Sequence, residues 1–332
     1  MKRFYFVLFY ISFFSFLSCD ESVSNKADFK EDYVLYSIIN CDTTFHTAYV
    51  SKSYNVDGLD PSVNTIDPAV KNAVVSISYA SGNYLFKDTS VERINNTRYS
   101  DNLNFYTLNN LDIKSREMHD YQKPITIYAS LPNSRTLTGN AFTIPSGDLY
   151  FDKYPSLFSA ADNPKVSEFS WKFIFSTNLL SNYYFLPSLE IDYSKVANGV
   201  LTRRKYAIPY KKIFSGNQEL PVFPGVIHAP YISFLNQDIK DAFAELSQGD
   251  SDKGSYTIHN LTFKIIIMDK NTASYWSSGR TFEDEFSVRI EAAEVSNING
   301  GYGVFGLYAG RTKKIKVDAD YVLPFGYKYE EK

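Results

Sequence analysis

Residues of the types that build common catalytic and metal sites are scarce in this sequence. The 332 residues include two cysteines and four histidines, His46, His119, His228 and His259. No two histidines have the H-x-x-x-H or H-E-x-x-H spacing of zinc sites, and no C-x-x-C pair is present. The G-x-S-x-G turn of hydrolases is also absent. We therefore expect a protein that is not an enzyme and holds no cofactor.

An excess of charge of one sign is also lacking. The formal net charge is -3, and 21% of the residues are charged. Nucleic acids and anionic lipid surfaces are recognised through clustered positive charge, so the composition gives no bulk electrostatic argument for either. The sequence thus predicts no nucleic-acid partner.

Long hydrophobic runs are confined to the amino terminus. Residues 4–17 are apolar over 14 positions apart from two serines, and they follow Lys2 and Arg3. A membrane-spanning helix needs about 20 apolar residues, whereas the apolar part of a secretory signal peptide is shorter. We expect residues 1–18 to be a signal peptide and the mature chain to have no transmembrane helix.

Cys19 stands where that signal peptide ends. The preceding Phe16-Leu17-Ser18 is not an A-x-A-like cleavage site; it resembles a bacterial lipobox, in which the cysteine is acylated with fatty acids such as palmitate and becomes the first residue. A single acyl chain binds a membrane only marginally, so two or three on one cysteine are needed for a durable anchor. The alternative is an ordinary signal peptide that is cleaved elsewhere, with Cys19 incidental. Cys41, in "YSIINCDTT", is then expected to be a free thiol, buried or half-buried.

Two acidic residues, Asp20 and Glu21, follow Cys19 directly. They resemble the export signal that sends lipoproteins of Bacteroidota to the outer leaflet of the outer membrane. They also fit the polar composition of residues 19–32, which predicts a flexible tether. Both interpretations agree with a lipid-anchored protein of the cell outer membrane, exposed at the surface.

Aromatic residues are abundant, with 27 Tyr and 26 Phe. Both are strand formers, and the excess fits either a β-rich core or an aromatic binding face. Several short segments, such as residues 33–40, 45–54 and "AVVSISYA", alternate or are rich in β-branched residues. The fold class we expect is mainly β: an amino-terminal β-sandwich domain at residues 33–146 and a β-rich, sandwich-like domain at residues 165–332. Two short helices are predicted in the second, one over residues 236–248, capped by Asn236 or Asp238, and one after Asp269.

Two motifs resemble a known family. "YVLYSIIN…HTAYVSKSYNVDGLDP" and "VSNINGGYGVFG" (residues 295–306) are similar to stretches of the Bacteroidota envelope lipoprotein family called domain of unknown function 4249. Lys52 stands where that family commonly has Arg, and a proline expected shortly before the second motif is missing. The resemblance implies lipid anchoring, a β-rich fold and, as a partner, a TonB-dependent outer-membrane receptor.

The glycines of the second motif have a physical interpretation of their own. Gly300, Gly301 and Gly303 permit a positive φ or a close backbone approach, with Tyr302, Val304 and Phe305 entering a core strand. A phosphate-binding loop would need a following helix, and the next residues are strand-like instead.

Two candidate sites remain. Asp57, Asp60 and Asp67 in one loop are candidate calcium ligands, although their spacing is not that of an EF-hand. Trp276, in "SYWSSG", is the tryptophan expected to be exposed. The sequence thus predicts a non-catalytic surface lipoprotein that is a binding or accessory component of an envelope or transport assembly. A glycan-binding module using Trp276, and an adhesion or structural surface protein, are the alternatives.

Overall fold

The chain folds mainly into β-strands, which confirms the expected fold class. The computed structural model describes residues 29–56, 60, 63–94, 99, 101–113, 123–144, 148–153, 157–158, 168–174, 183–208, 213–215, 218–220, 231–280 and 295–330. The expected signal peptide and acylation site, with Cys19, Asp20 and Glu21, lie outside these residues. None of the described helices is long and apolar enough to cross a membrane.

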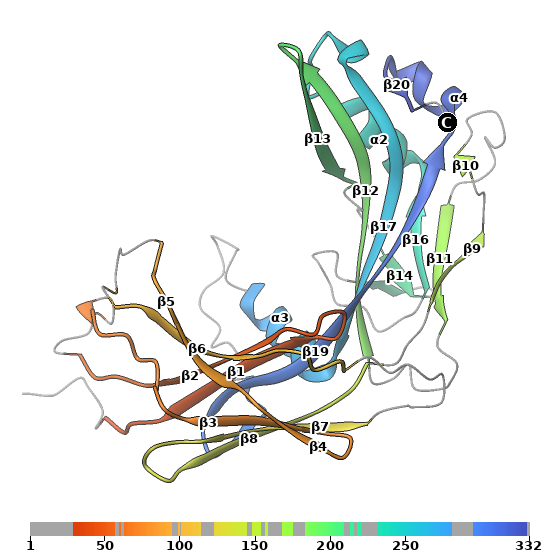
Figure 1. Cartoon of the computed structure of the whole chain (residues 1–332). Helices are drawn as coiled ribbons and strands as arrows, with labels where there is room; N and C mark the ends of the chain where they lie inside the picture. The colour runs from red at the N-terminus through yellow and green to blue at the C-terminus, as the bar shows by residue number, and fades with distance from the viewer. Residues whose placement is uncertain are drawn as a thin grey trace, which may run out of the picture.

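Strands from both ends of the sequence build the first lobe, the lower part of Figure 1. Its elements are β1 (Tyr33–Asn40), β2 (His46–Lys52), β3 (Val74–Tyr79), β4 (Gly82–Leu85), β5 (Lys87–Val91), β6 (Leu103–Leu108), β7 (Pro124–Ser130), β8 (Thr136–Phe142), β18 (Ile298–Asn299) and the first half of β19 (Tyr302–Val317). They form two layers, with the order β19-β1-β2-β6-β5 in one and β18-β8-β7-β3-β4 in the other. The first lobe is therefore a β-sandwich.

Strict alternation of side chains fills the space between these layers. Leu35 and Ile39 on β1 are completely buried, as are Ile77, Ile127 and Leu137 on β3, β7 and β8 of the facing layer. Successive residues of a strand point to opposite faces, so every second side chain enters the core. Burying such a side chain stabilises the fold by about 1.5–3 kcal/mol.

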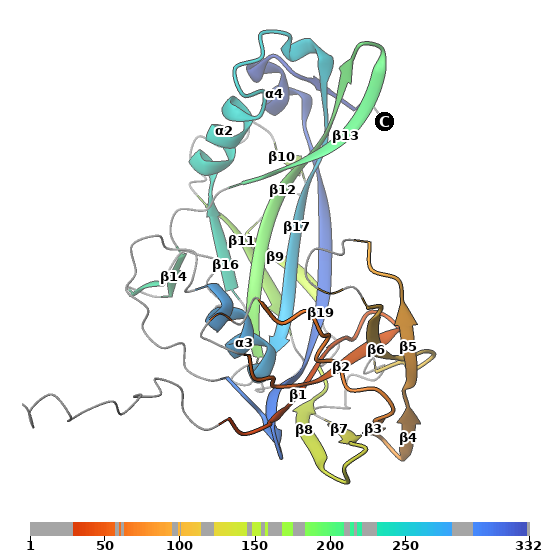
Figure 2. The ribbon, with the colours of Figure 1, turned by 90° about the vertical axis from the view of Figure 1, so that its left-hand side faces the viewer.

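The second lobe contains the longest strands. Its elements are β9 (Asp148–Lys153), β10 (Leu157–Phe158), β11 (Glu168–Ile174), β12 (Tyr183–Ala197), β13 (Val200–Ala207), β14 (Ile213–Ser215), β15 (Gln218–Leu220), β16 (Tyr231–Leu235), β17 (Tyr256–Asp269), β20 (Lys328–Tyr329) and the second half of β19, with helices α2 (Asn236–Glu245), α3 (Lys270–Arg280) and α4 (Ala319–Val322) and the short turns η3 (Lys253–Ser255) and η4 (Leu323–Phe325). The order β13-β12-β17-β19 forms a tall curved sheet, shown from two sides in Figures 1 and 2.

One strand, β19, belongs to both lobes. Its first half pairs in parallel with β1, from Val34↔Tyr302 to Asn40↔Tyr308. Its second half pairs antiparallel with β17, from Met268↔Tyr308 to Asn260↔Lys316. β18 also pairs with β8 of the first lobe. Strands that come after residue 164 therefore complete the sandwich of residues 33–146.

The glycines of "NINGGYGVFG" allow this junction to form. A Cβ added at Gly303 would lie 2.1 Å from the carbonyl oxygen of Leu35, and one at Gly301 would lie 2.3 Å from that of Tyr33. Gly300 and Gly303 also have positive φ angles of 86° and 118°. The close approach and positive φ expected from the sequence are thus confirmed.

The residues that follow these glycines enter a core strand, as expected, because Tyr302, Val304 and Phe305 form the start of β19. Val304 and Phe305 are buried, whereas Tyr302, at the first position of the strand, is 43% exposed.

Both predicted helices are present, but the predicted cap of the first is wrong. α2 begins directly after β16, with Leu235 at the N-cap position and no side-chain capping bond. The Asn236 side chain instead accepts a hydrogen bond from the Tyr321 hydroxyl at 2.9 Å. Tertiary contact with α4 has replaced the local capping bond.

α3 starts at the junction of the two lobes, just after Asp269. The Asp269 Oδ1 atom accepts the N–H of Thr272 at 2.8 Å. A Cβ added at Gly306 would lie 2.9 Å from the same oxygen, so this glycine gives the carboxyl its space. Burial raises the pKa of Asp269 to about 6.

The end of the expected tether is held against the sandwich. The N–H of Asp32 donates to the Ser53 hydroxyl at 2.8 Å, and Glu31 accepts a hydrogen bond from the Tyr33 hydroxyl at 2.6 Å. Glu31 also pairs with Lys52 at 3.0 Å. Glu31 and Asp32, at the end of the segment 19–32, are therefore fixed to the sandwich.

Candidate functional site

The tall sheet of the second lobe has one apolar face and one charged face. Leu189, Ile191, Phe263 and Ile265 are buried on the apolar side. This side is covered by the layer that contains β16 and α2. The Phe234 ring of β16 lies edge to face with the Phe263 ring, with 5.8 Å between the ring centroids. The opposite side carries charged and polar residues, so the alternation of the strands places them toward solvent.

Cross-strand pairing gathers charges from all four strands on this side. Asp192 on β12 lies opposite Lys205 on β13 and Asn260 on β17, and Asn260 lies opposite Lys316 on β19. In the next row, Thr262 lies between Glu190 and Lys314. We call this surface the charged face; its members are Glu190, Asp192, Arg203, Lys205, Asn260, Thr262, Lys264, Lys314 and Lys316.

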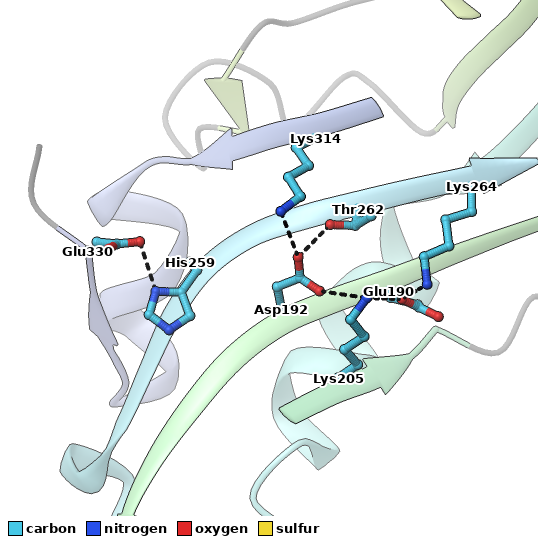
Figure 3. Close-up of polar contacts among 8 residues, drawn as sticks. All are labelled: Glu190, Asp192, Lys205, His259, Thr262, Lys264, Lys314 and Glu330. Atoms are coloured by element: carbon cyan, nitrogen blue, oxygen red, sulfur yellow. Dashed lines mark hydrogen bonds and ion pairs between the residues drawn. The ribbon is translucent and has the colours of Figure 1, made fainter. Parts of the chain in front are cut away.

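Two half-buried carboxylates lie at the centre of the charged face (Figure 3). Glu190 contacts the Lys264 ammonium at 2.6 Å and that of Lys205 at 3.4 Å. Asp192 accepts the Thr262 hydroxyl at 2.6 Å, and the ammonium groups of Lys205 and Lys314 lie 3.9 and 4.0 Å away. The carboxylates therefore hold the lysine side chains over the sheet.

The Lys205 and Lys314 side chains remain 55% and 63% exposed. Their ammonium groups are thus held near Glu190 and Asp192 while a large part of each side chain stays in water. A ligand arriving from solvent meets these two cations directly.

A bulge in β17 adds a histidine to this surface. Asp192 pairs with Asn260 and Tyr193 pairs with Ile258, so His259 has no partner in the ladder between them. A bulged residue lets both neighbours keep their faces while it re-aims its own side chain. His259 and Asn260 therefore both lie on the charged side, and Ile258 stays in the core.

His259 connects Ser194 to Glu330. Its Nδ1 atom lies 2.8 Å from Glu330 Oε2, and its Nε2 atom lies 3.0 Å from Ser194 Oγ. The hydrogen bond to His259 lowers the pKa of Glu330. The order serine, Nε2, Nδ1, carboxylate matches that of hydrolase triads.

Two features argue against a nucleophilic role for Ser194. The residue is only 2% exposed, so a substrate carbonyl has no access to its hydroxyl. Ser194 also lies in a strand that is paired on both sides, with Arg203 and Thr257 as its cross-strand neighbours. An oxyanion hole needs N–H donors aimed at the substrate, whereas the N–H groups of such a strand are directed at the neighbouring strands. The arrangement instead fastens the segment after β20 to β17, where the Glu330 N–H also bonds to the Ile258 carbonyl.

The charged face is hollowed at this point. An open depression of about 530 Å³ is lined by Asp192, Tyr193, Arg203, Arg204, Lys205, His259, Asn260, Lys314 and Glu330. Four of these side chains are cationic and two are carboxylates, so the lining is positive although the chain as a whole carries -3. With the hydroxyl, amide and imidazole groups nearby, this hollow can hold an acidic group and donate hydrogen bonds to it.

The calcium candidates do not converge. Asp57 lies outside the described residues, and Asp60 is exposed. The Asp67 carboxylate pairs with Arg93 and accepts hydrogen bonds from the Ala69 N–H and the Tyr49 hydroxyl. In the part of the chain that the structure describes, no three His, Cys, Asp or Glu side chains are placed to hold a metal ion.

Trp276 is less open to solvent than expected. It lies on α3 and is partly buried, with its indole nitrogen shielded from water. The neighbouring Tyr275 is the more exposed ring, at 39%, and it contacts the Tyr36 ring at 6.0 Å.

The first-lobe cysteine and histidine have structural positions. Cys41 is a buried free thiol, as expected, and burial raises its pKa to about 12. His46 is also buried, and its Nε2 atom lies 2.8 Å from the Leu111 carbonyl oxygen.

The charged face was not identified from the sequence, although the pattern was present. In "KKIKV", Lys314 and Lys316 alternate with the buried Ile315 and Val317. "LEID" repeats this pattern with Glu190 and Asp192. The alternation that predicts these strands also places their charged residues on one side. Examining the alternate positions for charge would therefore have indicated the charged face.

Comparison with protein-family models and with characterised proteins gave no match to this chain.

Proposed function

We propose that this chain is a non-catalytic, lipid-anchored protein of the outer membrane that binds an acidic ligand or partner on its charged face. The observation that carries the proposal is the positive hollow on a chain of negative net charge. Local charge of one sign in a depression attracts groups of the opposite sign and raises their local concentration.

The surroundings of the cations support binding rather than structural use alone. Lys264 is closely paired with Glu190 at 2.6 Å, whereas Lys205 approaches Glu190 to 3.4 Å and Asp192 to 3.9 Å, and Lys314 approaches Asp192 only to 4.0 Å. Long, partly exposed pairs contribute little to stability. These two lysines can therefore turn toward an incoming anion at small cost.

The resemblance to envelope lipoproteins supplies the setting of the proposal. Acylation of Cys19 would hold the folded lobes at the membrane, with Asp20 and Glu21 directing them to the cell surface. A TonB-dependent receptor is the partner that the resemblance implies, and an acidic patch on such a receptor would suit the charged face.

The binding proposal is tested by reversing the two exposed lysines. Lys205→Glu/Lys314→Glu should bind polygalacturonate, which has a carboxylate on each sugar, at least about tenfold more weakly, equivalent to about 1.4 kcal/mol. The matched control, Lys71→Glu/Lys87→Glu, changes the net charge equally at exposed positions of the first lobe. Affinity electrophoresis at increasing salt measures both, and wild-type binding should weaken with salt.

Two results would contradict this part of the proposal. One is that polygalacturonate does not retard the wild-type protein in the gel at low salt. The other is equal weakening in both double variants, which would assign the effect to net charge rather than to the charged face.

The anchor is tested separately by Cys19→Ala. This variant should lose acylation and move from the outer-membrane fraction to the soluble fraction, because the acyl chains supply the membrane affinity. Fractionation with a protease-accessibility assay on intact cells measures location and exposure. Unchanged membrane attachment of Cys19→Ala would refute the anchor.

A further inference from the structure

The layer β18-β8-β7-β3-β4 of the first lobe has a side that faces solvent. Unlike the charged face, this side presents no charged residues at its outward strand positions. We call it the uncharged face and define it by the outward positions of β3, β4, β7, β8 and β18. They are Val74, Ser76, Ser78, Asn83, Leu85, Pro124, Thr126, Tyr128, Ser130, Thr136, Thr138, Asn140, Phe142 and Asn299. In Figure 1 this layer is the lowest part of the molecule, and no ribbon lies below it.

The strand register establishes that these residues share one side. Tyr128 lies opposite Ser76 on β3 and Thr138 on β8. In the next row, Thr126 lies opposite Ser78 and Asn140. Directly opposed residues in a sheet point to the same face. The intervening residues, such as Ile127, are completely buried, and on the uncharged face itself Ser76 is 9% exposed.

The absence of charge is unusual for an exposed surface of this protein. Charged residues make up 21% of the chain and are concentrated at its surface. The uncharged face instead offers hydroxyl and amide groups in rows. Asn83, Ser130, Thr136 and Asn140 are exposed, and Thr126 donates to the Asn140 side chain at 2.8 Å.

An exposed aromatic ring lies in the middle of these rows. Tyr128 is 40% exposed, with serine and threonine as its cross-strand neighbours. Phe142, on β8, is 52% exposed at one end of the face. Tyr combines an apolar ring with a polar tip, so it contacts a ligand that has both apolar and hydroxyl surfaces.

We infer that the uncharged face binds a neutral glycan. A sugar ring has an apolar face that stacks on an aromatic ring, and its hydroxyl groups pair with hydroxyl and amide side chains, which both donate and accept. A flat arrangement of such groups across neighbouring strands suits an extended oligosaccharide. This inference does not depend on the charged face, which lies on the other lobe.

Other occupants fit the surface less well. A nucleic acid needs cations, and this face has none. Stable protein interfaces have an apolar core, whereas the exposed apolar side chains here are separated. Val74 and Leu85 are 57% and 63% exposed on β3 and β4, and rows of Ser, Thr and Asn lie between them and Phe142 on β8.

The test is affinity electrophoresis of the full chain in gels that contain neutral β-glucan, xylan, mannan or starch. At least one polymer should retard the wild-type protein, with little change between low and high salt. Tyr128→Ala should weaken that binding at least tenfold, whereas Tyr128→Phe, which keeps the ring, should stay within about threefold. Tyr302→Ala is the matched control, since Tyr302 is 43% exposed on another face.

A second variant covers the case in which Tyr128→Ala does not fold. Ser130→Glu introduces a charge at an exposed position beside Tyr128 and should weaken binding at least fivefold.

The inference is overturned if none of the four polymers retards the wild type, or if Tyr302→Ala weakens binding as much as Tyr128→Ala. It is also overturned if the wild type is a dimer in solution that Tyr128→Ala dissociates. The charged face is reported by the part of polygalacturonate binding that falls with salt and is lost in Lys205→Glu/Lys314→Glu but not in Tyr128→Ala, so the two proposals fail independently.

Discussion

The charged face and the uncharged face are built by the same alternation of side chains and differ in chemistry. On the charged face, β12, β13, β17 and β19 present lysine, arginine and carboxylate groups that pair across strands. On the uncharged face, β3, β4, β7 and β8 present hydroxyl and amide groups around Tyr128. The inward positions of both sheets are apolar, so the fold constrains only every second residue. The outward residues are left to determine what each face binds.

The comparison also shows how differently the two faces depend on their neighbours. Glu190 and Asp192 are 19% and 14% exposed and rely on nearby cations. The hydroxyl groups of the uncharged face are satisfied by water at little cost, because they carry no charge to desolvate. Substitutions on the charged face should therefore alter stability as well as binding.

The largest expected effect comes from breaking the strand that connects the lobes. Gly303→Ala would place a Cβ 2.1 Å from the Leu35 carbonyl oxygen at a φ of +118°, which should lower the free energy of unfolding by more than about 4 kcal/mol or prevent folding. Gly199→Ala is the matched control, because its φ is +75° and nothing lies within 4 Å. It should cost about 1–2 kcal/mol. Urea unfolding measures both, and equal effects would show that β19 tolerates separation from β1.

An intermediate effect is expected at the junction itself, and it depends on pH. The pKa of Asp269 is about 6 in the folded chain, above its ordinary value of 3.8. Between these values the unfolded chain has lost the proton and the folded chain still holds it, so stability should fall by roughly 1–3 kcal/mol as pH rises from 4 to 6. Asp269→Asn should not show this fall, because its amide oxygen still caps Thr272 without a charge.

The measurement for Asp269 is urea unfolding at pH 4, 5, 6 and 7. Asp101→Asn, at an exposed position of the first lobe, is the control for the loss of one carboxylate. Parallel curves for wild type and Asp269→Asn across this pH range would contradict the assignment.

The smallest expected effect compares one contact on each face. Lys264→Met keeps the stem of the side chain but leaves Glu190 without its contact at 2.6 Å, which should cost about 1 kcal/mol. Thr126→Val removes the hydroxyl that donates to Asn140 and should change stability by less than about 0.5 kcal/mol, because the bond is exposed. Thermal unfolding of the two variants measures the difference. If Thr126→Val were the more harmful change, the contrast between the faces would be wrong.

Local patterns in the sequence were sufficient to predict several individual strands. Residues 33–40 form β1 as expected. β1 pairs antiparallel with β2, so the two strands form a hairpin. Val75 and Ile77 in "AVVSISYA" are buried, as their alternation indicated. These predictions succeeded because burial of one strand face imposes a period of two on the residues themselves.

Contacts between distant residues could not be predicted in this way. β1 pairs with β19 across more than 260 residues, and His259 meets Glu330 across 71 residues. The His259 bulge depends on the register of β12 against β17, which neither strand specifies alone. The charged face therefore emerges only when four strands are aligned.

The pairing of β19 with β1 also sets an order of assembly. A ribosome makes β1 long before Tyr302–Val317, and until that strand exists the β1 edge that it will cover has no partner. Hairpins such as β12–β13, whose residues are close in the sequence, need no such delay, because short loops close quickly. Most strands of the sandwich are thus synthesised before the second lobe, yet the sandwich is completed only with β19, and its open edge would need shielding from other chains in the meantime.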